Sequence, residues 1–266
     1  MNEPDSRRPE IRTRVEDSVA TVELSNPRRR NALTLDMCRE LAHTMTQLDA
    51  RDDVHAVVLR GASEHFSAGV SIDELSAVLL DRDEDGNPLD HLSVADQAIS
   101  SVAKPTVAVV EGCCMGGGWQ IASACDFIVA ADDSRFAITP AKLGIIYPRS
   151  GIDRLVRCVG TARAKYLLLT GTEITGHHAR ILGLVADSFP REEFAERTHR
   201  LIRDLVARSR FSVHTMKRLI DLRGVDESQI EEAWAHGWAD MASGPDLQIG
   251  VDAFLRGRAP AFSWTP

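Results

Sequence analysis

The sequence predicts an α/β core followed by a mostly helical C-terminal region. Short β-branched apolar runs alternate with segments of helical periodicity over the first 150 residues, and nearly every later segment has helical periodicity. Beyond that alternation the chain has no repeats, and no linker-like stretch separates two independent units. We therefore expect an α/β core at residues 1–190 and a helical region at residues 191–266.

The first half of the chain supplies most of the expected strands. Ile11 to Leu24 is typical of two strands joined by a turn, and Thr34 is a suitable cap for a helix that continues to about Arg51. Residues 81–88 are charged and rich in helix breakers, which predicts a surface loop. The other expected strands are 54–59, 105–110, 127–131 and 135–138, and the other expected helices are 91–102, 121–126, 151–158, 161–170, 175–183, 191–209, 211–223, 226–243 and 246–256.

Composition argues against several classes of protein. The net charge of −8 disfavours a nucleic-acid or anionic-membrane surface, and no apolar run approaches the roughly 20 residues of a membrane span. The N-terminal residues are polar and include two acids, unlike a signal or transit peptide. The five cysteines lack metal-ligand spacing, which predicts small buried thiols and no metal site. We expect a cytoplasmic protein with no nucleic-acid or membrane partner.

A glycine-rich turn is the most informative stretch of the sequence. Gly116, Gly117 and Gly118 stand between the expected buried strand 105–110 and a short helix, where three glycines cost chain entropy and contribute no packing. Such a turn lets a ligand approach the backbone and presents N–H groups to an anion or a developing oxyanion. The alternative is a tight turn of unusual composition with no ligand.

A second turn, from Gly61 to Leu75, also leaves an expected buried strand and enters a helix through small residues. Two such turns could each direct one N–H group into a shared cleft. Two converging N–H donors stabilise a thioester oxygen as it becomes an enolate. The two turns together therefore indicate acyl-thioester chemistry more specifically than either turn does alone.

Motifs that carry a family resemblance are spread over nearly the whole chain. They are Ser25–Pro27, Asn31–Thr34, Phe66–Gly69, Lys104–Pro105, Glu111–Gly112, Gly116–Gly118, Leu143–Gly144 and the segment from Gly250 to Phe262. In these motifs the chain resembles the enoyl-CoA hydratase/isomerase superfamily, also called the crotonase superfamily.

The resemblance implies a crotonase-like spiral of ββα units with a C-terminal helical region that drives trimerisation, often with trimers paired into hexamers. It also implies an acyl-CoA thioester as substrate, with an oxyanion hole made by the backbone N–H groups of Val70 and Gly117. Coenzyme A enters as part of the substrate, and no separate cofactor is expected. The residues expected to contact coenzyme A are Arg28, Arg30, Ala68 and Ile72. For the two arginines the alternative is a solvated basic turn with no ligand.

The chain departs from the family pattern where acid–base chemistry is expected. Family hydratases place glutamates where this chain has Gln120 and Ala141. A third position, sometimes a catalytic aspartate, is Pro148, and the frequent aspartate after the first turn is Ser71. Gln120 can orient a water or a substrate group but cannot exchange a proton near neutral pH. Ordinary hydration of a 2-enoyl-CoA is therefore not expected.

Tyr147 favours a different reaction. The segment Thr139 to Ile152 resembles methylmalonyl-CoA decarboxylases of this superfamily, in which a tyrosine lies at the active site. Decarboxylation needs no general base, because loss of carbon dioxide leaves the enolate directly and a phenol or water can protonate it. Arg149 is a candidate partner for the substrate carboxylate. The alternative is that Tyr147 is only a large side chain in the cleft wall.

Three hypotheses about function remain open at this point. The first is an acyl-CoA enzyme that works through an enolate, with decarboxylation favoured and double-bond isomerisation next. The second is an atypical hydratase or lyase of secondary metabolism that uses Gln120 and an unexpected group. The third is a non-catalytic member that binds acyl-CoA or a partner protein, although such a protein would not need both N–H donors.

Overall fold

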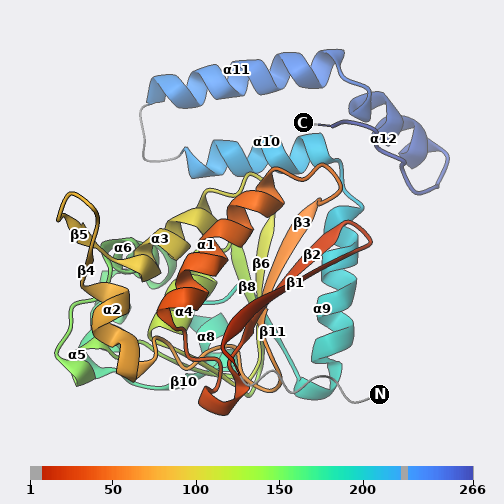
Figure 1. The fold of residues 1–266 in the computed structure, drawn as a ribbon. Coiled ribbons are helices and arrows are strands. Elements are labelled where there is room, and N and C mark those ends of the chain that lie inside the picture. The colour runs from red at the N-terminus through yellow and green to blue at the C-terminus, as the bar shows by residue number, and fades with distance from the viewer. Residues whose placement is uncertain (1–7, 223–226, 266) are drawn as a thin grey trace.

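A six-stranded sheet organises the part of the chain that the structure describes, residues 8–222 and 227–265 of a computed structural model (Figure 1). The strand order is β1-β2-β3-β6-β8-β11. β1 runs antiparallel to β2, and every other neighbouring pair is parallel. The strands are β1 (Glu10–Glu16), β2 (Val19–Ser25), β3 (Ala56–Gly61), β6 (Thr106–Val110), β8 (Phe127–Ala131) and β11 (Asp187–Phe189).

Helices cover both faces of this sheet, which explains why the central strands are apolar throughout. All five residues of β6 are buried. On one face lie α1 (Leu35–Asp49), α3 (His91–Ser100) and α4 (Gly117–Ser123), whose buried side chains join the larger apolar core. On the other face α9 (Arg191–Val206) contributes Phe194 to a second apolar cluster.

The first helix forms where its cap and periodicity predict. The side chain of Thr34 accepts a hydrogen bond from the Met37 N–H at 3.2 Å, which satisfies one of the free donors at the helix start. The buried residues of α1 recur at helical spacing and form its inner face. They are Met37, Cys38, Leu41, Met45 and Leu48.

Two smaller sheets contain short strands that the sequence did not predict, and one of them includes the expected strand at residues 135–138. β7 (Cys113–Met115), β9 (Arg135–Ala137) and β10 (Ile174–Thr175) pair in the order β10-β9-β7. The expected surface loop at 81–88 contains a hairpin of β4 (Asp81–Arg82) and β5 (Pro88–Leu89). A strand of two or three residues is too short to show alternation of apolar and polar side chains. It forms because it pairs with strands elsewhere in the chain.

The remaining helices surround the core or follow it. They are η1 (Pro27–Arg29), η2 (Ile72–Glu74), α2 (Leu75–Leu79), α5 (Pro140–Leu143), α6 (Arg149–Val159), α7 (Thr161–Thr170), α8 (Gly176–Leu182), α10 (Arg210–Asp221), α11 (Glu227–Ser243) and α12 (Asp246–Leu255). The expected helices 211–223 and 226–243 correspond to α10 and α11, although residues 223 and 226 lie outside the described residues.

The last helices lie apart from the sheet. In Figure 1 α10 crosses one end of the core, α11 lies beyond it, and α12 projects to one side. Trp234 and Trp238 stack on each other in α11 and are more than half exposed, and Phe254 of α12 is 86% exposed. α9 also follows residue 190, but it packs on the sheet of the core. The predicted boundary between core and helical region at residue 190 therefore stays a prediction.

Candidate active site

A large cleft lies where two parallel strands end. β3 and β6 both run into glycine-containing turns at the same edge of the sheet, the edge at which ligands bind in α/β proteins. The cleft has a volume of about 1170 Å³. Its lining includes five of the predicted site residues: Ala68, Val70, Ile72, Gly117 and Tyr147.

The two turns are joined through their backbones. The Ser67 N–H donates to the Cys113 carbonyl at 3.0 Å, and the Met115 N–H donates to the Ser67 carbonyl at 2.9 Å. Gly118 completes the contact, since a β-carbon there would lie 2.7 Å from the Ser67 carbonyl oxygen. This close approach gives a structural reason for one glycine of the triplet.

The direction of the Val70 N–H group follows from how its neighbours pair. The Gly69 carbonyl accepts from the Leu33 N–H, and the Ser71 N–H donates to the Leu33 carbonyl, both at 2.7 Å. In an extended segment successive residues direct their backbone groups to opposite sides. The Val70 N–H therefore faces away from Leu33, toward the cleft that Val70 lines.

The Gly117 N–H group lies beside that of Val70. Gly117 is the first residue of α4, so its N–H has no partner within the helix. A β-carbon on Gly117 would lie 3.2 Å from the Val70 nitrogen, and one on Gly69 would lie 3.2 Å from the Gly117 nitrogen. Among the described residues neither N–H donates a hydrogen bond. Two unpaired donors of this kind match an oxyanion hole.

Tyr147 is packed into the inner wall of the cleft. It is 7% exposed, and its ring centroid lies 6.3 Å from that of Trp119. Its hydroxyl donates to the Gly116 carbonyl oxygen at 2.7 Å. Burial, with a smaller contribution from Cys114, raises the pKa of Tyr147 well above its usual value, against the opposing effect of a backbone hydrogen bond from Gln120. The phenol is therefore protonated across the physiological pH range.

Gln120 lies behind the cleft wall and is not among the residues that line the cleft. Its side chain is fully buried, and Nε2 donates to the Ser150 hydroxyl at 2.9 Å. The Oε1 atom has no hydrogen-bond partner among the described residues, and it would lie 1.9 Å from a β-carbon on Gly151. Ala141, the second residue that stands where a catalytic glutamate was expected from the family resemblance, is exposed and does not line the cleft.

The cleft is also lined by a carboxylate, that of Asp90, which was not predicted as a site residue. Asp90 caps α3, and its side chain accepts from the N–H groups of Leu92 at 3.0 Å and Ser93 at 3.2 Å. Leu92 in turn approaches Gly117, since its Cδ2 would lie 3.4 Å from a β-carbon on that residue. An aspartate before an apolar helical run is the usual cap pattern, so nothing local distinguished Asp90 as a cleft residue.

The predicted basic contacts lie at the margin of the cleft or outside it. Arg149 lines the cleft mouth, and its side chain is 95% exposed with a loose contact to Asp153 at 3.5 Å. Arg28 and Arg30 are exposed and do not line the cleft. The loop that carries them is attached to it, because the Ala68 N–H donates to the Arg30 carbonyl at 2.8 Å.

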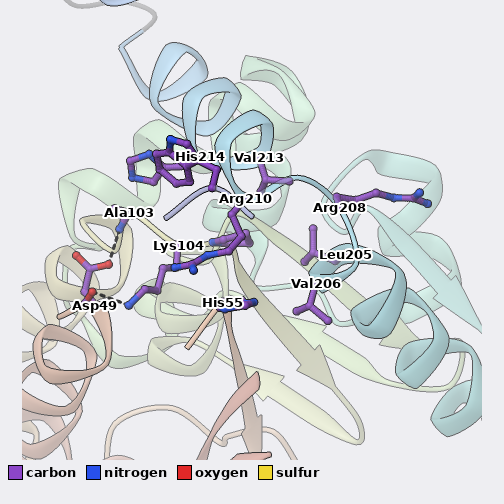
Figure 2. A pocket seen from close by; sticks show the side chains of 12 residues that line it. Asp49, His55, Ala103, Lys104, Leu205, Val206, Arg208, Arg210, Val213 and His214 are labelled. Carbon is purple, nitrogen blue, oxygen red and sulfur yellow. Dashed lines mark hydrogen bonds between the residues drawn. The ribbon is translucent and has the colours of Figure 1, made fainter. Parts of the chain in front are cut away.

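A second cavity, of about 100 Å³, lies at the opposite ends of the strands (Figure 2). Figure 2 shows Lys104, Arg210 and His55 among the residues that line it. The Lys104 amine donates to the carbonyls of Leu48, Asp49 and Arg51 at 2.5–2.8 Å, which caps the C-terminal end of α1. This lysine therefore has a structural role, and the cavity lies away from the N–H groups of Val70 and Gly117.

The cysteines are mostly buried thiols. Four of the five are buried, and the described residues contain no group of three or more His, Cys, Asp or Glu placed to hold a metal ion. Burial raises the pKa of Cys38 to about 12, which keeps that thiol protonated and unreactive. No helix within the described ranges has the length and apolarity needed to cross a membrane.

Comparisons with known proteins agree on one family. The model of the enoyl-CoA hydratase/isomerase family matches residues 14–264. A putative enoyl-CoA hydratase of Thermus thermophilus is 33% identical, over 92% of this chain and 97% of the relative. The peroxisomal Δ3,5-Δ2,4-dienoyl-CoA isomerase of Arabidopsis thaliana is 29% identical, over 95% of each chain.

A crystal structure of an enoyl-CoA hydratase/isomerase family member superimposes with a TM-score of 0.95 at 55% identity, covering 98% of each chain. That of a putative family protein from Hyphomonas neptunium gives a TM-score of 0.83 at 30% identity, covering 96% of this chain and 97% of that one. These similarities confirm the predicted fold class.

Proposed function

Because the chain belongs to the enoyl-CoA hydratase/isomerase family, whose members act on acyl-CoA, we propose that it holds an acyl-CoA enolate between the N–H groups of Val70 and Gly117. The reaction we favour is decarboxylation of a malonyl-type thioester. The observation that carries the proposal is the pair of adjacent N–H groups at the cleft that have no hydrogen-bond partner among the described residues. Such donors interact more strongly with an enolate oxygen than with a neutral thioester oxygen, which lowers the barrier.

Decarboxylation makes few demands on the side chains of the site. The bond between the α-carbon and the carboxylate breaks, and its electron pair forms the enolate, whose oxygen the two N–H groups stabilise. Carbon dioxide leaves, and a proton from water then completes the product at the α-carbon. Arg149 at the mouth is placed to pair with the substrate carboxylate, because its guanidinium is exposed and only loosely held.

Hydration makes a demand that the site does not meet. It requires a group that activates water and a group that delivers a proton to the α-carbon. The Gln120 side chain is buried and donates a hydrogen bond to the Ser150 hydroxyl, and Ala141 has no polar side chain. The protein should therefore hydrate crotonyl-CoA slower than about one turnover per second, the low end of ordinary enzyme rates.

A second candidate is double-bond isomerisation, and one observation favours it. Asp90 is the only carboxylate among the described residues that line the cleft, and an isomerase needs a base that removes a proton and returns it. The Arabidopsis relative is named as an isomerase. Both carboxylate oxygens of Asp90 already accept hydrogen bonds, from two N–H groups and from the Ser93 hydroxyl, so the carboxylate is held as the cap of α3 and isomerisation is the second choice.

The proposal extends to coenzyme A and to assembly. Arg28 and Arg30 contact its phosphates, and Ala68 and Ile72 contact the arm that carries the thioester. No cofactor other than this coenzyme A is needed. The working form is a cytoplasmic homotrimer or hexamer, which would cover the exposed Trp238 and Phe254.

The deciding experiment offers three substrates to the same protein. Malonyl-type, 2-enoyl and 3-enoyl CoA thioesters are incubated separately, and the products are identified by mass spectrometry. Loss of carbon dioxide from the malonyl-type substrate supports the proposal, and conversion of the 3-enoyl substrate alone supports isomerisation. If none of the three turns over, the protein binds acyl-CoA without catalysis.

A further inference from the structure

We infer that Tyr147 is a positioning residue whose hydroxyl fixes the peptide between Gly116 and Gly117 so that the Gly117 N–H points into the cleft. The inference rests on the proposed role of that N–H as an oxyanion donor. It adds the side chain that sets the direction of the donor, and it assigns the tyrosine a task other than proton transfer.

The geometry of a single peptide group carries the argument. The Gly116 carbonyl and the Gly117 N–H belong to one planar trans peptide, so they point in opposite directions. The Tyr147 hydroxyl donates to that carbonyl oxygen at 2.7 Å. Holding the oxygen toward Tyr147 therefore holds the N–H away from it, on the side of Val70.

This peptide needs such a restraint more than most. It lies between two glycines, and Gly116 has φ +47°, a conformation that residues with a side chain rarely adopt. A peptide flanked by glycines can rotate at little steric cost. Among the described residues, its oxygen also accepts the first helical hydrogen bond of α4, from the Gln120 N–H at 3.1 Å. Tyr147 adds a second and shorter bond.

The same contact strengthens the donor. A hydroxyl that donates to a carbonyl polarises the peptide and makes its N–H a better donor. The phenol, the peptide and the enolate oxygen would therefore form one chain of hydrogen bonds. Because burial raises the pKa of Tyr147, the hydroxyl keeps its proton. A phenol has one hydrogen, and here it is directed at Gly116 rather than at the substrate.

The test compares Tyr147→Phe with Tyr166→Phe. Tyr166 is the chain's other tyrosine, lies in α7 and is 56% exposed, so its replacement controls for loss of a phenol elsewhere. Each protein is loaded with a saturated acyl-CoA carrying ¹³C at the thioester carbonyl, and the carbonyl stretch is measured by isotope-edited infrared spectroscopy. Binding of the wild-type protein should lower the frequency. The shift should be smaller in Tyr147→Phe and unchanged in Tyr166→Phe.

Kinetics supply the second readout. Tyr147→Phe should lower kcat about tenfold, the worth of roughly one hydrogen bond, while KM stays within about twofold. Should Tyr147→Phe not fold, 3-fluorotyrosine is incorporated in the Tyr166→Phe background. Its phenol is a stronger donor and should increase the infrared shift.

The outcomes separate this inference from the proposed function. An infrared shift that is equal in wild type and Tyr147→Phe, or that fluorination leaves unchanged, overturns the positioning role even if the enzyme is active. A shift that Tyr147→Phe reduces, in a protein that turns over none of the three substrates, retains the positioning role and rejects the proposed reaction.

Discussion

The backbone nitrogen of Val70 faces Gly117 so closely that a β-carbon on residue 117 would lie 3.2 Å from it. The same β-carbon would meet the Cγ2 atom of Val70 at 3.0 Å, so only glycine fits there without a shift of its neighbours. The two donors are therefore close enough to share one oxygen atom. Testing that arrangement requires variants that separate steric crowding from loss of the N–H group.

Gly117→Pro and Gly117→Ala form such a pair. Proline is tolerated at the first position of a helix but removes the N–H, whereas alanine keeps the N–H and adds the crowding β-carbon that both variants share. We expect kcat of Gly117→Pro to fall about 10²–10³-fold below that of Gly117→Ala. Circular dichroism verifies the fold of each variant. Equal turnover by the two proteins would show that Gly117 donates nothing to the reaction.

Asp90→Asn separates the two candidate reactions. Asparagine caps a helix about as well as aspartate, so α3 should remain intact while the negative charge is lost from the cleft. Decarboxylation should continue within about threefold of the wild-type rate, since it needs no base. Isomerisation of a 3-enoyl-CoA should fall about 10²-fold or more. Loss of decarboxylation in a folded variant would make Asp90 part of that mechanism and contradict our account.

Gln120→Glu should lower stability and should not restore hydration. The side chain is fully buried and does not line the cleft, so a carboxyl there is desolvated and its folded-state pKa rises above the unfolded value of about 4.3. A raised carboxyl pKa means that the folded state retains a proton the unfolded state releases. The loss of stability should therefore be small near pH 4 and grow with pH by up to about 1.4 kcal/mol per unit.

The measurement is urea unfolding of Gln120→Glu and wild type at pH 5 and pH 8. Gln120→Met is the control, because it fills a similar volume without the Oε1 atom that lacks a partner in the described part of the chain. The methionine variant should show no such pH dependence. Rapid hydration of crotonyl-CoA by the glutamate variant would mean that the side chain reaches the cleft after all.

Assembly can be tested at the exposed apolar side chains of the last helices. Light scattering should give a mass three or six times that of the monomer, and Phe254→Asp should reduce it, because a charge would be buried in the interface. Leu80→Asp, at an apolar side chain that is 76% exposed beside the cleft, should leave the mass unchanged. A monomeric wild-type protein at micromolar concentration would refute the proposed trimer.

Local sequence was sufficient for much of the fold and for the two turns that line the cleft. The helix after Thr34, the buried strand before Glu111 and the glycine triplet all carry signals in neighbouring residues: a cap, a run of β-branched side chains and a loss of side chains. The same applies to Gln120 and Ala141, whose chemistry excludes proton transfer wherever they lie. Strands such as β7 and β10 were missed because two or three residues show no period.

Only the tertiary structure decided how these parts act together. The Val70 N–H faces the cleft because Leu33 pairs with the residues on either side of it. The Tyr147 hydroxyl is turned to Gly116, and the carboxylate of Asp90 reaches the cleft wall. Each of these directions depends on contacts between segments far apart in the chain. Short-range propensity contains no information about such contacts, whereas the packing of the two turns fixes them within hydrogen-bond distance.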